Sequence, residues 1–572
     1  MIKRDAILHQ PMSNFAHAID ETHIVFRLRA AKDNLTCCTL FYGDTACRVN
    51  PVIFSAIEME RVATTDLFDW FEVTLESPYR RVCYYFELKT EDETALYYGD
   101  LFYDRVVGER SEYYKLPYNR REDIADVPDW LKHAVIYNIF PDSFASGRRS
   151  ISNQPCEKSQ NDLTLRGKLG GTINGIRENL DYIADLGFNC IYLNPIFAAG
   201  QYHKYDLVDY YQIDPCFGTN ESFRALVSEC HARGMKIIID GVFNHCGWDF
   251  FAFVDVVKKG QASAYVDWFY NLKFPVVRPE TPDEIPNYEC FGYERLMPKL
   301  NTGNPEVRDY FQKVGVHWIE QYDIDGWRLD VADEVDHFFW MDFCRVVKQS
   351  KPEAAIIGEV WQSAPFWLDG RMFDSTMNYD MMKHCKRFFA RGDIDAAAFD
   401  ARVADMRMRY RKNLIYGQLN LLDSHDVPRF LSLCGEDARR YRLAVLFLFS
   451  FAGAPSIFYG DEQGLTGLIE EDYRAPMRFE GGELAAFFKA CITLRNQYTC
   501  LRTGEFRTRL TEGGLYCFER ADEKDCIIVA LNAQERSAGL PGELRGAEIL
   551  LSAGVEEGTM APFGYCVARK RM

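Results

Sequence analysis

Between about residues 129 and 460, short apolar runs alternate with longer segments of helical pattern, and this alternation constrains the fold more than any other feature. The runs have the length and composition of buried strands, and they lie at residues 134–137, 190–193, 236–239, 324–329, 355–357, 373–377, 418–422 and 456–459. Between the first two runs, residues 175–186 carry apolar side chains close to helical spacing. Eight buried strands separated by helices predict an α/β fold, a closed parallel (β/α)8 TIM barrel, with an open parallel sheet as the alternative.

The segments on either side of this region have a β pattern. Short alternating runs such as residues 70–75 and 82–88, separated by polar turns, are typical of a β-sandwich, and similar runs return after about residue 505. A long, proline-rich and aromatic-rich excursion between the third and fourth runs indicates an inserted subdomain at about residues 245–300. We therefore expect an N-terminal β-sandwich at residues 1–125, a barrel with this insertion at residues 126–490 and a C-terminal β-sandwich at residues 491–572.

The composition excludes several kinds of partner. The chain has 572 residues and a formal net charge of −18, and 47% of its residues are hydrophobic. A chain of this length and apolar content forms several domains. Its acidic surface repels nucleic acid and anionic membranes but not a neutral substrate such as a sugar. Its apolar stretches are shorter than the roughly 20 residues of a membrane span. Its first residues lack the apolar segment of a signal peptide, so we expect a cytoplasmic protein.

Charged residues collect where the predicted strands end. Asp240 through His245 follow the third run, Arg328-Leu-Asp330 ends the fourth, Gly358-Glu359-Val-Trp361 follows the fifth, and Asp423-Ser-His425-Asp426 follows the seventh. Each motif alone is weak, because an Arg-x-Asp pair is more often a surface ion pair and a His-Asp pair can cap a helix. Function in a barrel lies at the carboxyl ends of its strands, so carboxyl groups from four strands favour one active site.

Two carboxyl groups on one rim suit hydrolysis of a glycosidic bond with retention, which needs them about 5–5.5 Å apart. One group attacks the anomeric carbon, and the other protonates the leaving oxygen and later activates water. We expect Arg328, two residues before Asp330 on the same face of a strand, to lower the pKa of Asp330. Trp361 and nearby negative charge favour the protonated form of Glu359. Other groups that can bind sugar hydroxyls are His245, His425 and Asp426.

The four strand-end segments resemble the four shared regions of the α-amylase family of glycoside hydrolases. Two more segments are similar to one group of that family, the neopullulanases, cyclomaltodextrinases and maltogenic amylases: Met297-Pro-Lys-Leu-Asn301 and His203-Lys-Tyr-Asp206. The opening, from Ala6 to Arg81, resembles the starch-binding-like N-terminal domain of the same group. The resemblance extends over essentially the whole chain.

This resemblance implies an enzyme that hydrolyses α-1,4-glucosidic bonds in cyclodextrins, pullulan or maltodextrins through a covalent glycosyl-enzyme intermediate. Asp330 would be the nucleophile, Glu359 the general acid/base and Asp426 the transition-state stabiliser. The implied substrate-binding residues are Arg328, His245, His425 and Tyr205 at the cleaved bond, Trp361, Phe291 and Tyr293 on the leaving-group side, and Arg474. The aromatic residues of this set could instead belong to the core. The resemblance also implies a homodimer in which the partner's N-terminal domain narrows the cleft, with α-glucan oligosaccharides or cyclodextrins as ligands.

Three positions depart from the group's usual pattern, which leaves the substrate preference open. Asp333 stands in place of Asn, Gln362 in place of His and Glu470 in place of Asp. An α-glucan transglycosylase is an alternative, because water and a sugar can attack the same intermediate. A catalytically dead carbohydrate-binding protein is a weaker alternative, because such relatives usually lack one of the three carboxylates that this chain keeps.

Many members of the group hold calcium in a loop after the first strand. In the matching loop of this chain, Ser146 replaces an asparagine and Arg148 replaces an aspartate, and Thr172 follows the Gly-Gly pair where the group has aspartate. Calcium needs about 6–8 oxygen ligands, several of them charged, and an arginine repels it. We predict that the protein uses no metal and no cofactor, with a weaker calcium site on Asn153 and Asn161 as the alternative.

Overall fold

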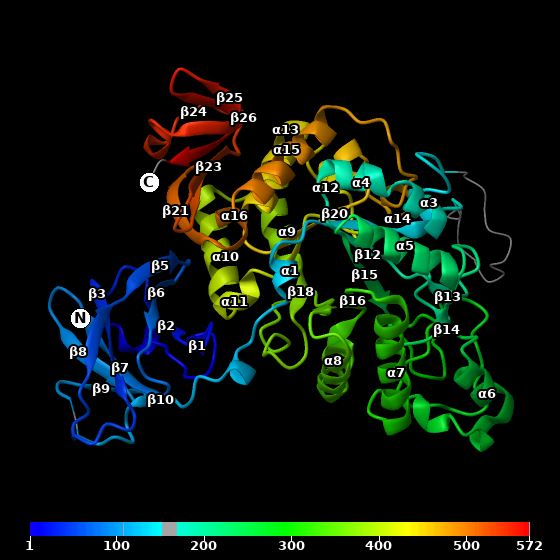
Figure 1. Ribbon diagram of the computed structural model, residues 1–572, viewed down its shortest axis with the longest axis horizontal. Coiled ribbons are helices and arrows are strands. Elements are labelled where there is room, and N and C mark those ends of the chain that lie inside the picture. Colours follow the sequence, from blue (N-terminus) through cyan, green and yellow to red (C-terminus); the bar gives the residue numbers. More distant parts are fainter. Residues whose placement is uncertain (107, 152–168, 571–572) are drawn as a thin grey trace. The chain divides into compact units, whose positions relative to one another are not determined.

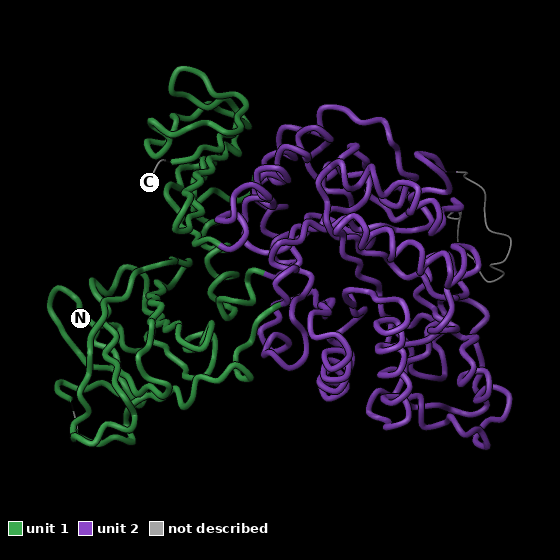
Figure 2. The backbone as a smooth tube through the Cα atoms, viewed as in Figure 1, with its two compact units in different colours: residues 1–127, 392–416, 504–572 green, residues 128–391, 417–503 purple. Residues whose placement is uncertain are grey.

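The computed structural model describes residues 1–106, 108–151 and 169–570 of the chain. The chain divides into two compact units, which Figure 2 shows in different colours. The barrel unit comprises Pro128–Arg391 and Gly417–Thr503, and the terminal unit comprises Met1–Val127, Gly392–Tyr416 and Gly504–Met572. The terminal unit thus contains both ends of the chain and a short segment from its middle. The three domains expected from the sequence, with their boundaries, stay a prediction.

Eight strands of the barrel unit close a parallel barrel (Figure 1). Their order is β11 (Ile136–Ile139), β12 (Cys190–Leu193), β15 (Lys236–Gly241), β16 (Gly326–Leu329), β17 (Ala355–Gly358), β18 (Ser375–Asn378), β19 (Leu419–Leu421) and β20 (Ala454–Phe458). The barrel closes where β11 pairs with β20, for example Ile136 with Ser456. Each apolar run predicted as a strand overlaps one of these eight, so the (β/α)8 prediction is confirmed.

Helices form most of the connections between barrel strands, because parallel neighbours need a long crossover. The longer helices between strands are α3 (Ile173–Glu178), α4 (Leu180–Leu186), α5 (Asn220–Ala232), α7 (Pro305–Tyr322), α8 (His337–Ser350), α9 (Tyr379–Cys385) and α13 (Ala438–Ser450), and α15 (Glu483–Gln497) follows the last strand. Short helices are α1 (Asp129–Lys132), α2 (Pro141–Phe144), α12 (Phe430–Leu433), α14 (Glu470–Tyr473) and α16 (Cys500–Thr503). The one helix expected at residues 175–186 is two, α3 and α4, which meet at Asn179.

Apolar side chains fill the barrel interior and fix the strand ends. The buried cluster there includes Ile136, Tyr192, Ile238, Ile357, Met377 and Leu419. Gly358 ends β17 against the ring of Phe373, where an added Cβ would lie 2.5 Å from the ring. The strand that carries Glu359 therefore has room only for glycine at the position before it.

Two excursions bring further residues to the carboxyl end of the barrel. The chain between β15 and β16 contains α6 (Phe251–Lys259) and then folds back, pairing His245 with Lys299. The hairpin of β13 (Phe197–Ala199) and β14 (Leu207–Ile213) follows β12 and holds Tyr205 in its connection. The segments that resemble the family's loop markers thus lie next to the strand ends.

The terminal unit is built from antiparallel sheets. One sheet has the order β1 (Ala16–Ala18), β2 (His23–Ala31), β6 (Phe68–Glu76) and β5 (Glu60–Thr64). A second has β4 (Ser55–Glu58), β3 (Cys37–Asp44), β7 (Val82–Lys89), β8 (Thr94–Tyr98) and β9 (Leu101–Tyr103), with β10 (Tyr114–Leu116) on β7. The C-terminal sheet has β21 (Glu505–Glu512), β22 (Leu515–Ala521), β23 (Cys526–Asn532), β26 (Thr559–Lys570) and β24 (Ala538–Gly539), with β25 (Glu548–Glu556) on β26. Two helices, α10 (Ala396–Met408) and α11 (Lys412–Ile415), complete the unit.

The antiparallel sheets agree with the β pattern expected at both ends of the chain. Within residues 1–106, 108–151 and 169–570, no helix has the length and apolar character needed to cross a membrane.

Candidate active site

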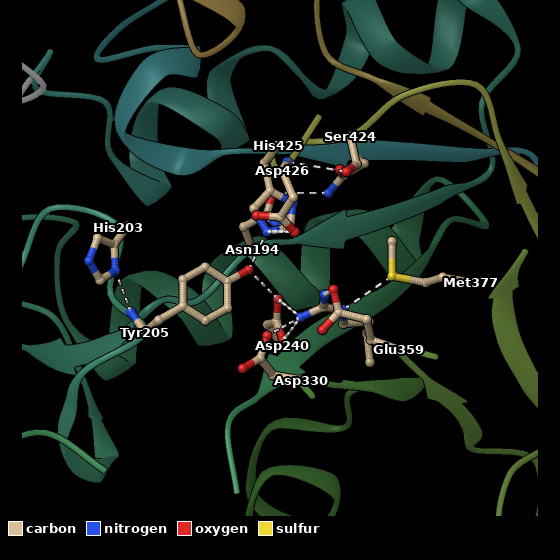
Figure 3. A network of polar contacts seen from close by, with 12 residues as sticks. Asn194, His203, Tyr205, Asp240, Asp330, Glu359, Met377, Ser424, His425 and Asp426 are labelled. Atoms are coloured by element: carbon tan, nitrogen blue, oxygen red, sulfur yellow. Dashed lines mark hydrogen bonds and ion pairs between the residues drawn. The ribbon is translucent and has the colours of Figure 1, made fainter. Parts of the chain in front are cut away.

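Polar side chains from several strand ends meet at the carboxyl end of the barrel (Figure 3). Asp240 lies in β15, Arg328 lies in β16, and Asp330 and Glu359 come directly after β16 and β17. They adjoin a cavity of about 570 Å³, whose lining includes Tyr205, His245, Phe291, Asp330, Glu359, Trp361, Asp426 and Arg474. The three carboxyl groups predicted to be catalytic, Asp330, Glu359 and Asp426, therefore share one cavity.

The buried guanidinium of Arg328 joins the carboxyl groups of three strands. Its Nη1 donates to both oxygens of Asp240, at 2.8 and 3.0 Å, and to Asp330 Oδ1 at 2.9 Å. Its Nη2 lies 2.8 Å from Glu359 Oε1, and its Nε donates to Met377 Sδ at 3.3 Å. One fixed cation thus positions the predicted nucleophile and the predicted acid/base relative to each other.

The backbone after Asp330 also holds Glu359. Val331 has φ 44° and ψ 47°, a left-handed conformation that is unfavourable for a β-branched residue. In this conformation its N–H donates to Glu359 Oε2 at 2.9 Å, and the N–H of Ala332 donates to the Glu359 carbonyl oxygen at 3.2 Å. The turn that follows the nucleophile position is therefore strained and fixes the second carboxyl group.

Two acids of the site, Asp330 and Asp426, have raised pKa values. Burial and the neighbouring Glu359 raise the pKa of Asp330 well above its usual value, and Arg328 only opposes this rise. Burial, and then Glu359, raise the pKa of Asp426 to about 7. As expected, the contact with Arg328 lowers the pKa of Asp330. The net shift of that pKa is nevertheless upward, because burial and repulsion between the acids outweigh the effect of Arg328.

A hydrogen-bonded set of side chains around His425 adjoins the carboxyl groups (Figure 3). The rings of Tyr205 and His425 stack with centroids 5.6 Å apart and planes 6° apart, and the Tyr205 hydroxyl contacts His425 Nε2 and donates to Asp240 at 3.1 Å. Asn194 Nδ2 lies 2.9 Å from His425 Nδ1, and His425 Nε2 lies 3.0 Å from Asp426. Burial and the nearby Arg328 hold the pKa of His425 well below its usual value. We therefore assign a neutral ring that accepts at Nδ1 and donates from Nε2.

Aromatic rings lie at the mouth of the cavity. Phe291 stacks on His245 with ring centroids 5.2 Å apart, and Trp361, which is 39% exposed, stacks on Tyr379 at 4.0 Å. Tyr293 is 70% exposed and is not among the residues that line the cavity. Among the residues predicted from the sequence, Tyr293 is thus the one that the structure leaves outside the cavity and its first contacts.

Arg474, the residue directly after α14, also contacts the site. Its Nε donates to the His425 carbonyl oxygen at 2.8 Å, and its Nη1 donates to Glu470 at 2.6 Å and to the Tyr202 hydroxyl at 2.7 Å. Its Nη2 lies 3.6 Å from Asp426. Arg474 therefore connects the wall of the cavity to the carboxyl group of Asp426.

Sequence reasoning assigned no role to two residues of the site, although it noted Asp240 among the charged residues at the strand ends. Asp240 accepts from Arg328, Tyr192 and Tyr205, and the Tyr379 hydroxyl lies 3.5 Å from Glu359 Oε1. Asp240 stands at the end of the third run, and Tyr379 directly follows the sixth strand. Tyr379 could have been found by examining the residues after every strand, including the strands that no charged residues follow. The strain at Val331 has no signal in the sequence.

The loop after β11 does not fit a calcium ion, as far as its described residues show. Arg148 and Arg149 are exposed there and bring positive charge. The side chain of Asn179 is bonded to the backbone of Gly147, Arg149 and Gly175, and the carboxyl group of Asp142 accepts the N–H groups of Leu169 and Gly170. Oxygen atoms that could bind calcium are thus used within the protein. Asn153 and Asn161, named above as an alternative, lie outside the described residues.

The chain matches known proteins over nearly its whole length. The α-amylase catalytic domain matches residues 138–483, and the α-amylase N-terminal Ig-like domain matches residues 1–120. Neopullulanase 2 of Thermoactinomyces vulgaris is 42% identical over 539 residues, which cover 92% of this chain and 91% of that protein. A cyclomaltodextrinase of Geobacillus thermopakistaniensis (strain MAS1) is 39% identical over 549 residues, covering 94% of this chain and 93% of that protein. A solved cyclomaltodextrinase structure matches with a TM-score of 0.90 at 35% identity, covering 99% of this chain and 100% of that chain.

Identity of this level over both chains reflects more than a shared barrel, a fold on which many unrelated activities occur. The catalytic-domain match includes the strand ends that hold Asp330, Glu359 and Asp426. The chain is an enzyme that belongs to the α-amylase family of glycoside hydrolases, in the group of neopullulanases, cyclomaltodextrinases and maltogenic amylases that its sequence resembles.

Proposed function

We propose that this hydrolase cleaves α-1,4-glucosidic bonds in cyclodextrins, pullulan or maltodextrins, with retention at the anomeric carbon and through a covalent glycosyl-enzyme intermediate. Hydrolysis of α-glucans itself agrees with the names of its relatives. One observation carries the mechanism: Asp330 and Glu359, at the ends of neighbouring strands, are both held by Arg328 at the wall of one cavity. Two fixed carboxyl groups on one rim are what the double displacement needs.

In the first step, a carboxylate oxygen of Asp330 forms a bond to the anomeric carbon while the bond from that carbon to the glycosidic oxygen breaks. Glu359 gives its proton to the departing oxygen, so the leaving sugar departs as a neutral alcohol. Arg328 favours the ionised form of Asp330 against the effect of burial. The product is a glycosyl ester of Asp330 and an ionised Glu359.

In the second step, Glu359 takes a proton from water, and the water oxygen attacks the anomeric carbon. The ester bond breaks, and Asp330 regains its charge. A sugar hydroxyl in place of water would give transglycosylation, so the same two residues serve both outcomes. The ratio depends on how well the leaving-group side holds a second sugar.

The remaining residues bind the sugar on either side of the cleaved bond. Asp426 faces the positive charge that develops on the ring, while neutral His425 and His245 can exchange hydrogen bonds with hydroxyl groups without adding charge. Tyr205 offers an aromatic face at the cleaved bond, and Phe291 and Trp361 offer faces on the leaving-group side. Tyr293, outside the cavity, would contact only a longer substrate.

Three further expectations belong to this proposal. The active protein is a homodimer in which the partner's N-terminal domain narrows the cleft, so that small or cyclic glucans are preferred over bulky starch. It acts in the cytoplasm. It needs no metal, since the exposed Arg148 and Arg149 bring positive charge to the described part of the loop after β11.

Two variants test the roles of the carboxyl groups. Asp330→Asn should abolish turnover of maltodextrin, because an amide does not attack the anomeric carbon. Glu359→Gln should lose most activity on maltodextrin. On an aryl α-maltoside with an activated leaving group, which departs without a proton, its kcat/KM should fall far less, while its kcat stays low because the second step lacks a base. Asp309→Asn, on the exposed face of α7, is the matched control and should behave as wild type.

With an aryl maltoside and Glu359→Gln, mass spectrometry of the quenched enzyme should find the sugar on the peptide that contains Asp330. An Asp330→Asn enzyme with wild-type turnover, or a sugar attached elsewhere, would overturn the assignment.

A further inference from the structure

A second pair of carboxyl groups lies behind the active-site wall and takes no part in the chemistry above. Asp423 follows β19, three residues before Asp426, and Asp461 begins the 3-10 turn Asp461–Gln463 after β20. Arg429 forms an ion pair with Asp461, and Asp423, Asp461 and Arg429 are 3%, 4% and 0% exposed, respectively. A buried group of this kind must satisfy its charges internally.

The hydrogen bonds of this group are incomplete unless a proton is added. Arg429 Nη1 donates to Asp461 Oδ1 at 2.9 Å, and the N–H of Phe430 donates to Asp423 Oδ2 at 2.6 Å. Asp423 and Asp461 are in hydrogen-bond contact with each other, yet Asp423 Oδ1 receives no donor from any described residue. Two carboxylates cannot hydrogen-bond without a proton, because each is only an acceptor when ionised.

The charge balance leads to the same conclusion. Two ionised carboxylates beside one guanidinium would leave a net negative charge in a buried site. Burial raises the pKa of both Asp423 and Asp461, and repulsion from Asp423 raises the pKa of Asp461 further. One proton shared by the pair makes the group neutral. The other titratable groups that face it are Cys434, Tyr441, Tyr459 and Glu462.

The group is connected to the active site through a closed path of contacts. Arg429 Nε donates to the carbonyl oxygen of Tyr473 at 2.9 Å. The next residue, Arg474, donates to the carbonyl oxygen of His425 at 2.8 Å and lies 3.6 Å from Asp426. The backbone from Asp426 back to Asp423 completes this closed path. The segments after β19 and β20 and the helix α14 are therefore tied together by one buried group.

We propose that Asp423 and Asp461 share one proton and that this acid–carboxylate pair, with Arg429, positions Asp426 and Arg474 for catalysis. The positioning role rests on the proposed function of the cavity, whereas the shared proton does not. None of the three residues touches substrate. They act by fixing the two segments that supply Asp426 and Arg474.

Loss of the shared proton should loosen this wall. As pH rises, both carboxyl groups become ionised, and their repulsion acts on the segments after β19 and β20. Because their pKa values are raised in the folded state, the folded protein binds more protons than the unfolded chain above about pH 4. The free energy of unfolding should therefore fall as pH rises through the folded pKa of the pair, and kcat should fall over the same range.

The test compares wild type with Asp461→Asn. The amide can donate to Asp423 Oδ1 and accept from Arg429, which replaces the shared proton by a fixed hydrogen bond and leaves one carboxylate for one guanidinium. We expect the alkaline fall of kcat to move to higher pH by about one unit, a tenfold gain in kcat at a fixed pH on that limb, with KM little changed. The melting temperature should also lose much of its alkaline dependence. Asp423→Asn is the mirror variant if Asp461→Asn does not fold.

Asp400→Asn is the matched control. Asp400 is another acid whose pKa is raised by burial, but it bonds to Thr508 and Tyr516 in the terminal unit. Its replacement should change how the melting temperature depends on pH and leave the pH dependence of kcat unchanged.

Infrared difference spectra in H2O and D2O test the proton directly and do not require turnover. A protonated-carboxyl band should disappear in Asp461→Asn and persist in Glu359→Gln. If that band is the same in wild type and Asp461→Asn, the shared proton is refuted. If the band disappears but the kcat profile does not move, the positioning role is refuted while the proton assignment holds.

Discussion

Replacing Arg328 tests the electrostatics of the active site most directly, because three carboxyl groups meet at its guanidinium. In Arg328→Lys, a single ammonium cannot reproduce the planar fork, so at least one charge-assisted hydrogen bond is lost. Such a bond contributes about 1.5–3 kcal/mol. Since about 1.36 kcal/mol corresponds to a factor of ten, kcat/KM should fall roughly 10- to 150-fold.

Arg328→Met removes the cation altogether and should have a second effect. Buried carboxylates without a partner should lower the free energy of unfolding by about 3–5 kcal/mol. Arg328 lowers the pKa of Asp330 against burial and Glu359, so without it that pKa rises further. The nucleophile then ionises only at higher pH, and the acid limb of kcat/KM should move to higher pH.

The assay is the pH dependence of kcat/KM on an aryl α-maltoside, with melting temperature measured on the same samples. Arg495→Lys is the control, because Arg495 is equally buried and its Nη1 donates to the backbone carbonyls of Phe449, Phe451 and Leu501. It should lower the melting temperature and leave the acid limb in place. An Arg328→Met enzyme with an unmoved acid limb, or with kcat/KM within about threefold of wild type, would show that the reasoning is wrong.

Three further predictions follow from the site and its surroundings. Dialysis against EDTA should leave activity intact, and the prediction of no metal fails if activity is lost and calcium restores it. Sedimentation should show a dimer at micromolar concentration, and kinetic assays should give a higher kcat/KM on β-cyclodextrin than on amylose. A monomer, or a preference for amylose, would count against the shared cleft. Trp361→Ala removes an aromatic face worth about 0.5–1.5 kcal/mol, so the ratio of transglycosylation to hydrolysis on maltotriose should fall roughly 2- to 12-fold. An unchanged product ratio would place the acceptor sugar elsewhere.

The fold was predictable because the barrel strands are buried on both faces and most of them are rich in apolar residues. Runs such as Cys190–Leu193 and Lys236–Gly241 are buried by the barrel core inside and helices outside, so they stand out as short apolar segments. The break between α3 and α4 was not predictable from periodicity, because it depends on hydrogen bonds of Asn179 with Gly147 and Gly175.

The candidate site was predictable where charged residues stand at strand ends, and less so where geometry decides. Asp330 and Glu359 follow their strands directly, so their meeting follows from the barrel. The raised pKa of Asp330 depends on how far burial and Glu359 outweigh Arg328, which spacing along the chain does not reveal. The link from Arg429 to Tyr473 joins residues 44 positions apart and has no sequence signature.

Val331 has a consequence for how this enzyme can diversify. The contact that holds Glu359 comes from a main-chain N–H, which any residue except proline supplies at that position. Under the proposed mechanism, the spacing of the two carboxyl groups thus depends on Arg328 and on this stretch of backbone, and not on the side chain at position 331. Substitutions around the cavity, such as those at positions 333, 362 and 470, can therefore change which glucan is preferred over evolutionary time while the stereochemical outcome is preserved.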